Sequence, residues 1–403
     1  MIARSCRAVP ALLALAGAVL ASAPLAGAQA PPSLSSAAAA ILVDAQDGVV
    51  LVAKNPRERR SIASTTKLMT ALLSLERARP GERFVAPRYD ALPVESKIDL
   101  RAGERMAVAD LLEALLLESA NDAAVTLAEG VSGSREAFVG DMNDRARALG
   151  LEDTSYANPI GLDDPSNYST AADLADLAAL LLRRPRFARI VDMPSAVLAT
   201  GARRRVVANR NNLVTEHPFV DGVKTGFTAQ AGNVLVGSAS GRGAQVVSVV
   251  MGEPTEVQRD ADTLALLRYG LAQFERRRVL DEGRTVASAA IEHRDERALL
   301  VPATGLNVTV REGQRVRSVV EAPAELEGPL AAGERVGYVS VYRGDRRVGR
   351  VPLVTAAKVP GAGILRVLTS VLGVPLTLLV ALGIFIIAVR GMRARGRRST
   401  TAG

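Results

Sequence analysis

A serine and a lysine three residues apart are the first residues of this chain whose types and spacing could do chemistry. Ser64 and Lys67 lie where a loop runs into a segment with helical apolar spacing, marked by Leu68 and Leu72. Residues i and i+3 share one face of a helix, so the hydroxyl and the amine can meet. A serine becomes a good nucleophile when a neighbouring base takes its proton. The Ser-x-x-Lys spacing therefore predicts acyl transfer through a serine.

The choice of lysine supports this interpretation, because only a neutral amine can act as the base. Burial, the positive end of a helix and a second cation each lower the pKa of a lysine. Arginine stays protonated, so it could not replace Lys67 in this role. Of the 50 Lys and Arg residues, the lysines are Lys54, Lys67, Lys97, Lys224 and Lys358. A solvated lysine after a helix-capping serine is the alternative, so further motifs are needed.

Ser119 and Asn121 form a second motif. They follow a strongly apolar helix that we expect over residues 106–117, in the sequence Leu-Glu-Ser-Ala-Asn-Asp. A hydroxyl and an amide two residues apart in a loop between helices can face one cleft. Ordinary helix capping explains the same residue types, because Ser and Asn are common at such boundaries.

Lys224, Thr225 and Gly226 form a third motif, on or beside a predicted strand. A strand edge offers backbone N–H groups, Thr225 adds a hydroxyl, and Lys224 adds a cation. Gly226 allows another backbone to approach closely. This set suits the binding of a carboxylate. An exposed edge strand protected by a lysine is the alternative interpretation.

Composition excludes several other classes of protein. The net charge of +8 comes almost entirely from seven arginines near the two ends: Arg4, Arg7, Arg390, Arg393, Arg395, Arg397 and Arg398. The body of the chain is close to neutral and contains no Trp, so we expect no nucleic-acid partner.

The chain offers few groups for metal or cofactor chemistry. Cys6, the only cysteine, lies in the predicted targeting segment, which leaves no disulfide, no thiolate metal site and no cysteine nucleophile. The two histidines, His217 and His293, lie far apart in the sequence. We expect no metal and no cofactor. A Ser-His-Asp triad that uses His217 remains open, because His217 lies near the third motif.

The two ends of the chain predict export and insertion into a membrane. Residues 1–30 combine arginines, a short apolar run and Ala-Gln-Ala, as a cleavable secretory signal does; an uncleaved anchor is the alternative. Residues 364–389 include 23 uncharged residues, enough to span a bilayer with a kink at Pro375. The basic tail, residues 390–403, predicts a cytoplasmic C-terminus and hence an extracytoplasmic body. A buried core helix is the alternative for the second segment.

The body of the chain changes its periodicity twice. An apolar hairpin over residues 38–53 precedes Ser64, helical patterns fill residues 105–190, and strands return between residues 219 and 251. Strands on both sides of a helical block predict one sheet built from distant segments, with helices as a second layer. We expect one domain over residues 31–275, closed by a helix over 261–274, and a small all-β domain over 276–356.

The three motifs, in this order in an exported chain, resemble those of the penicillin-binding proteins and serine β-lactamases. The chain looks most like the low-molecular-mass D-alanyl-D-alanine carboxypeptidases. The resemblance covers roughly residues 36–389 and includes segments 158–164 and 168–171. It implies an α/β (α+β) fold, in which a central antiparallel sheet is joined to a mainly helical subdomain. Many relatives end in an amphipathic surface helix, whereas this chain has an apolar segment long enough to span a bilayer.

The resemblance also implies roles for individual residues. Ser64 is the acylated nucleophile and Lys67 its general base, while Ser119 relays protons. The substrate-binding residues that it implies are Asn121, Lys224, Thr225, Gly226, Phe227 and Arg259. Among these, the backbone N–H of Phe227 joins that of Ser64 in the oxyanion hole. The implied partners are peptidoglycan stem peptides ending in D-Ala-D-Ala, β-lactams as covalent inhibitors, and the membrane.

Two other functions remain open on the sequence alone. A β-lactamase would use the same acylation machinery, but we find no Glu-x-x-Leu-Asn segment after Ser119 to supply a deacylating carboxylate. A non-catalytic wall-binding or sensor protein would use the β domain for binding. The retained Ser64 and Lys67 argue against this second possibility.

Overall fold

The structure is a computed structural model that describes residues 30–361 and 363–398. The predicted secretory signal, residues 1–30, lies outside the described residues apart from Ala30. The last five residues of the predicted basic tail lie outside them as well.

A five-stranded antiparallel sheet forms the centre of the N-terminal part, with strand order β2-β1-β11-β10-β9. Its strands are β1 (Ala39–Asp44), β2 (Val50–Lys54), β9 (Val220–Thr228), β10 (Gly232–Gly241) and β11 (Ala244–Glu253). The hairpin formed by β1 and β2 therefore pairs with a strand more than 200 residues later, through the β1–β11 ladder. This confirms the prediction of one sheet built from distant segments.

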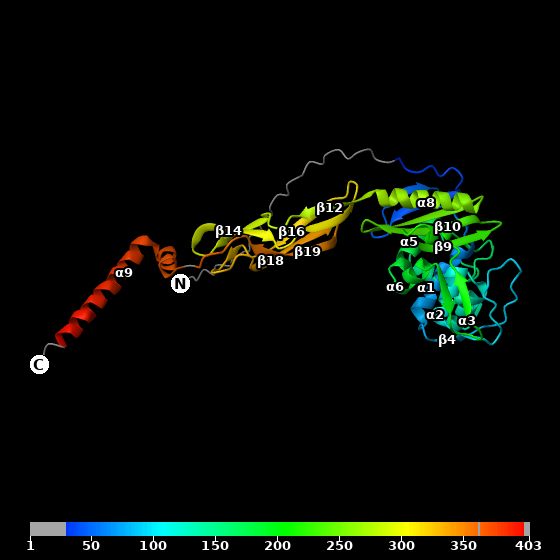
Figure 1. Ribbon diagram of the computed structural model, residues 1–403, viewed down its shortest axis with the longest axis horizontal. Coiled ribbons are helices and arrows are strands. Elements are labelled where there is room, and N and C mark those ends of the chain that lie inside the picture. The colour runs from blue at the N-terminus through cyan, green and yellow to red at the C-terminus, as the bar shows by residue number, and fades with distance from the viewer. Residues whose placement is uncertain (1–29, 362, 399–403) are drawn as a thin grey trace, which may run out of the picture. The chain divides into compact units, whose positions relative to one another are not determined.

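Both faces of this sheet are covered by helices. Ile41 and Val249 belong to a core shared with the helical subdomain, whereas Leu42 and Val250 belong to a core with Leu266 of α8 (Glu256–Ala272). Neighbouring residues of a strand point to opposite faces, which explains why β1 and β11 are mostly apolar and buried along nearly their whole length. Figure 1 shows α8 on one side of β9 and β10, and α1, α2 and α3 on the other.

The helical subdomain connects β2 to β9. Its helices are α1 (Lys67–Arg77), α2 (Val108–Glu113), α3 (Asn121–Ser132), α4 (Arg135–Ala148), α5 (Ala171–Leu182), α6 (Pro185–Asp192) and α7 (Asn212–Glu216). A 3₁₀ turn, η1 (Ala63–Thr66), precedes α1, and a π turn, η2 (Ala114–Glu118), follows α2. The side chains of Ser134, Thr170 and Thr255 cap α4, α5 and α8 by accepting a backbone N–H bond.

The single helix predicted over residues 106–117 is wrong in two respects. Met106 and Ala107 belong to strand β5 (Arg105–Ala107), which pairs with β4 (Arg83–Val85). The last turn widens into η2 and ends at Ser119 in a left-handed conformation, with φ of 63°. Hydrophobic spacing alone does not reveal a short two-stranded ribbon or a π turn, because both keep the same residues buried. The other short pairs are β3 (Arg60–Ser61) with β6 (Tyr168–Ser169) and β7 (Ser195–Leu198) with β8 (Arg205–Ala208).

The C-terminal part has an all-β architecture, as predicted, with a core of its own that includes Val339, Val341 and Leu353. A six-stranded sheet has the order β16-β18-β19-β14-β13-β17, and β12 pairs with β15. Their bounds are β12 (Phe274–Leu280), β13 (Ala287–Ile291), β14 (Arg294–Pro302), β15 (Leu306–Arg311), β16 (Val316–Glu321), β17 (Glu325–Leu326), β18 (Arg335–Arg343) and β19 (Arg346–Thr355).

One long helix, α9 (Ile364–Arg398), follows the β strands. Its segment Gly373–Arg390 has a mean hydropathy of 2.2 and is long and apolar enough to cross a membrane. The helix is interrupted at Gly373, two residues before the kink expected at Pro375.

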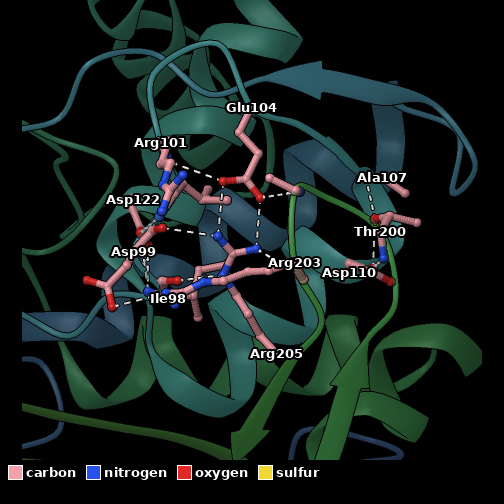
Figure 2. Close-up of polar contacts among 12 residues, drawn as sticks. Ile98, Asp99, Arg101, Glu104, Ala107, Asp110, Asp122, Thr200, Arg203 and Arg205 are labelled. Carbon is pink, nitrogen blue, oxygen red and sulfur yellow. Dashed lines mark hydrogen bonds and ion pairs between the residues drawn. The ribbon is translucent and has the colours of Figure 1, made fainter.

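A buried ion pair holds together segments of the helical subdomain that are distant in sequence (Figure 2). Arg205 donates to both carboxylate oxygens of Glu104, at 2.8 and 3.0 Å. The same guanidinium donates to the carbonyl oxygens of Ile98 and Asp99, at 2.7 and 3.0 Å. Arg205 therefore fastens one end of the loop that joins β4 to β5, here called the β4–β5 loop (residues 86–104).

We expect Glu104→Gln to destabilise the protein by about 3 kcal/mol at pH 7, because it removes one charge of a buried pair. The hydrogen bonds from Arg205 lower the pKa of Glu104 from 4.5 to about 2. The pair therefore stabilises the fold above pH 4.5, and this contribution is lost as the pH falls towards 2. Urea unfolding followed by circular dichroism should show the full difference between variant and wild type at pH 7, and a smaller one at pH 3.5, which lies between the two pKa values. Equal stability at pH 7 would contradict the prediction, and exposed Glu152→Gln is the control.

Candidate active site

The candidate site is centred on Ser64, at the second position of η1. The residue before it, Ala63, has φ of 47°, a conformation rare for a residue with a side chain. This turn places Lys67 as the first residue of α1, with Nζ 2.9 Å from Ser64 Oγ. Lys67 Nζ also donates to the carbonyl oxygen of Ile160 at 2.5 Å. The predicted meeting of hydroxyl and amine is therefore present in the structure.

The environment of Lys67 favours the neutral amine. Lys67 is fully buried, and burial is the main reason why its pKa lies well below the usual value. The positive charges of Lys224 and Arg210 lower this pKa further, while the charge of Glu95 opposes them. A neutral amine at hydrogen-bond distance has a lone pair that can accept the proton of Ser64.

The carbonyl of Ile160 is positioned by a tight loop around Asn158. The Asn158 side-chain oxygen accepts the backbone N–H groups of Gly161 and Leu162, at 2.7 and 3.1 Å. At Gly161, which has φ of 88°, an added Cβ would lie 2.0 Å from the carbonyl oxygen of Ala63. Only glycine fits there, so the Asn158 loop and the Ser64 turn pack backbone against backbone.

The third motif lies on β9, the edge strand of the central sheet, next to Ser64. At Gly226, an added Cβ would lie 3.1 Å from Ser64 N and 3.2 Å from the carbonyl oxygen of Ile62. Lys224 is buried, and burial together with the charges of Arg210 and Arg259 lowers its pKa to about 7. The sequence predicted a cation here, and the lowered pKa adds that the Lys224 ammonium group loses its proton near neutral pH.

The second motif lies between η2 and α3. The Ser119 hydroxyl is buried and has no hydrogen-bond partner among the residues that the structure describes. Combined with the left-handed backbone of Ser119, this is an unusual and costly arrangement, of the kind found at functional sites. Asn121 is the first residue of α3, and its side-chain nitrogen donates to Glu95 Oε2 at 2.6 Å.

The remaining predicted residues have fewer described contacts with the three motifs. Phe227 follows Gly226 on β9, and its side chain is 64% exposed. Arg259 lies in the first turn of α8, is buried, and pairs with the Asp260 carboxylate at 2.8 Å. Its charge acts on Lys224, so it belongs to the same electrostatic neighbourhood. His217 ends α7 and stacks near Phe219, with ring centroids 5.8 Å apart.

Comparison with known proteins identifies the family of this chain. A family model described as D-alanyl-D-alanine carboxypeptidase matches residues 26–255, and one described as the C-terminal domain of penicillin-binding protein 5 matches residues 274–361. The chain belongs to the D-alanyl-D-alanine carboxypeptidase family. This confirms the resemblance drawn from the three motifs, and with it the serine D,D-peptidase fold.

Individual relatives agree with the family models. The chain is 33% identical over 337 residues to the D-alanyl-D-alanine carboxypeptidase DacA of Haemophilus influenzae, a match that covers 78% of this chain and 82% of the relative. It is 29% identical to DacF of Bacillus subtilis, over 84% of this chain and 89% of the relative. Among solved structures, penicillin-binding protein 5 from Haemophilus influenzae matches with a TM-score of 0.59 and 31% identity, over 82% of this chain and 99% of that one.

Two residues of this carboxypeptidase-family site were missed from the sequence. Arg210 donates to Glu118 Oε1 at 2.6 and 3.1 Å, and its charge acts on both lysines. Glu95 contacts Asn121 and opposes the other charges around Lys67. Neither residue belongs to one of the three motifs, and both come from loops. Only the fold brings them to the site.

We expect Gly226→Ala to slow the covalent labelling of Ser64 by benzylpenicillin by about a hundredfold. The new methyl group would push β9 away from the Ser64 turn, and displaced backbone donors lose much of their effect. Intact-mass spectrometry against time measures the labelling rate. Gly140→Ala on α4, where an added Cβ has no neighbour within 4 Å, should label as the wild type does. An unchanged rate in Gly226→Ala would show that this close approach is not needed.

Proposed function

We propose that this protein removes the terminal D-Ala from peptidoglycan stem peptides through an acyl-enzyme on Ser64. The observation that carries the proposal is the 2.9 Å contact between Ser64 Oγ and a buried amine whose pKa is lowered. Family membership supplies the substrate class, and the three motifs supply the roles below.

In the first step, the neutral Lys67 amine accepts the Ser64 proton while Oγ attacks the carbonyl carbon of the penultimate D-Ala. The carbonyl oxygen gains negative charge, which the backbone N–H groups of Ser64 and Phe227 stabilise. Gly226 supports this arrangement, because its missing side chain lets β9 lie against the Ser64 turn.

Breakdown of the tetrahedral intermediate needs a proton on the leaving nitrogen. The proton taken up by Lys67 passes to that nitrogen through Ser119, whose hydroxyl has no hydrogen-bond partner in the described part of the chain and can relay it. The C–N bond then breaks, D-Ala leaves, and the acyl group stays on Ser64. Water completes the cycle by attacking the ester: its oxygen bonds to the acyl carbon, one of its protons goes to Ser64 Oγ, and the shortened peptide is released.

The remaining residues bind the substrate. Asn121 holds the amide of the peptide, and Thr225 and Lys224 bind the terminal carboxylate, with Arg259 behind them. A bound carboxylate favours the charged form of Lys224 and compensates for the burial that lowers its pKa. β-Lactams would acylate Ser64 by the same steps and stay attached to it, as expected for a penicillin-binding protein.

We expect Ser64→Ala to abolish both the release of D-Ala from a pentapeptide and the mass increase with benzylpenicillin, because the attacking oxygen is absent. A chromogenic cephalosporin separates the proposal from a β-lactamase, since a carboxypeptidase should stop after about one turnover on the experimental timescale. Labelling that persists in Ser64→Ala would show that Ser64 is not the nucleophile. Rapid, continuous turnover of the cephalosporin by wild type would reject the carboxypeptidase proposal in favour of the β-lactamase. Wild type that releases no D-Ala would favour the sensor alternative.

We further propose that the protein is exported and anchored by α9, with its C-terminus in the cytoplasm. The apolar segment Gly373–Arg390 and the arginines that follow it support this topology. Deleting residues 364–403 should move the protein from the carbonate-washed membrane fraction to the supernatant. Deleting only residues 399–403 is the control and should leave it in the membrane. A long deletion that stays in the membrane would show that another segment anchors the chain.

A further inference from the structure

The β4–β5 loop carries a carboxylate into the candidate site. Glu95 is half-buried, and the described hydrogen bonds of its side chain all come from donors to the carboxylate. Oε2 accepts from the Asn121 side-chain nitrogen at 2.6 Å and from the Tyr89 hydroxyl. Oε1 accepts the backbone N–H of Leu92 at 2.9 Å.

A carboxylate in this place fixes which way the Asn121 amide faces. An ionised carboxylate is only an acceptor, so the nitrogen of Asn121, not its oxygen, must face Glu95. The reverse orientation would bring two oxygens together. The Asn121 oxygen is therefore turned away from the Glu95 carboxylate, while the amide also interacts with the Tyr89 hydroxyl. The contact is charge-assisted and hence stronger than one between neutral groups.

The loop that carries Glu95 is itself firmly held. The Asp122 carboxylate accepts the backbone N–H groups of Ile98 and Leu100, at 3.1 and 2.9 Å. The backbone N–H of Asn121 donates to the carbonyl oxygen of Ser96 at 2.8 Å. Arg205 fastens the carbonyls of Ile98 and Asp99, as Figure 2 shows. These anchors do not involve the Glu95 side chain, so the loop should keep its place when that side chain is changed.

We propose that Glu95 is a positioning residue that holds the Asn121 amide in the orientation required to bind the scissile peptide. The proposal rests on the proposed function, because it takes Asn121 as the residue that binds the substrate amide. The carboxylate also contributes a negative charge that acts on Lys67.

The charge of Glu95 makes the proposal testable through the pH dependence of activity. Burial tends to raise the pKa of Glu95, but the hydrogen bonds from Tyr89, Asn121 and Leu92 and the charge of Lys67 outweigh it, and the pKa is lowered. Glu95 is therefore ionised at neutral pH and opposes the neutral form of Lys67. Removing its charge lowers the pKa of Lys67 further, so the neutral base persists to lower pH.

The test compares Glu95→Ala with Glu95→Gln in the full chain, using D-Ala release from a pentapeptide across pH. Glu95→Ala frees the Asn121 amide and should lower kcat/KM by about tenfold, as expected for a lost charge-assisted hydrogen bond. Glu95→Gln keeps an acceptor of the same shape, so it should restore most of kcat/KM near pH 8. It should also move the acidic limb of the profile down by about half a pH unit, because the charge is gone. Glu82, just before β4, accepts the backbone N–H of Arg79, so Glu82→Gln is the control and should match wild type.

Three outcomes would overturn the proposal. Profiles of both variants that coincide with wild type would show that Glu95 has no role at the site. Equal losses in both variants, with no shift of the acidic limb, would indicate a structural role only. An acyl-enzyme that accumulates in Glu95→Gln would make Glu95 a base for deacylation instead. Labelling of wild type by benzylpenicillin is scored separately: if wild type neither labels nor releases D-Ala, the proposed function fails before Glu95 is tested.

Discussion

The candidate site depends on keeping the charge off one buried amine. Lys67 is removed from water and lies near the cations Lys224 and Arg210, and its hydrogen-bond partners among the described residues are the neutral oxygens of Ser64 and Ile160. An ammonium group in such a place would normally be paired with a carboxylate, and burial without one favours the neutral base. Among the described residues, Glu95 is the acid whose charge raises the pKa of Lys67. Its carboxylate is held by hydrogen bonds to other groups, and the pKa of Lys67 stays low.

The scaffold maintains that environment by close backbone packing. Glycines at positions 161 and 226 let the Asn158 loop and strand β9 lie against the Ser64 turn, where an added Cβ would be only 2.0 to 3.2 Å from backbone atoms. Ala63 and Ser119 adopt left-handed conformations in the same region. Such conformations cost free energy, and the large cores around the central sheet stabilise the fold enough to keep them.

The parts of the molecule that could be predicted are those with a local signal. The Ser64–Lys67 contact follows from helical spacing, β1 and β2 from an apolar hairpin, and the family from three ordered motifs. The roles assigned to Ser119, Asn121 and Arg259 remain predictions. The missed features depend on contacts between distant segments: β5 pairs with β4, Arg210 reaches Glu118, and Glu95 reaches Asn121. A sequence pattern of period two or 3.6 carries no information about which loops meet.

The weakly held proton of Lys224 has a consequence for ligand binding. With a pKa of about 7, this lysine is only partly charged in neutral solution before an anion arrives. A carboxylate that binds beside it pulls a proton from solvent, so ligand and proton enter together at alkaline pH. Affinity for anionic ligands should then decline as the surroundings become more basic, and the protein would release them without any change of shape. Protons would thus act as a co-ligand at this site.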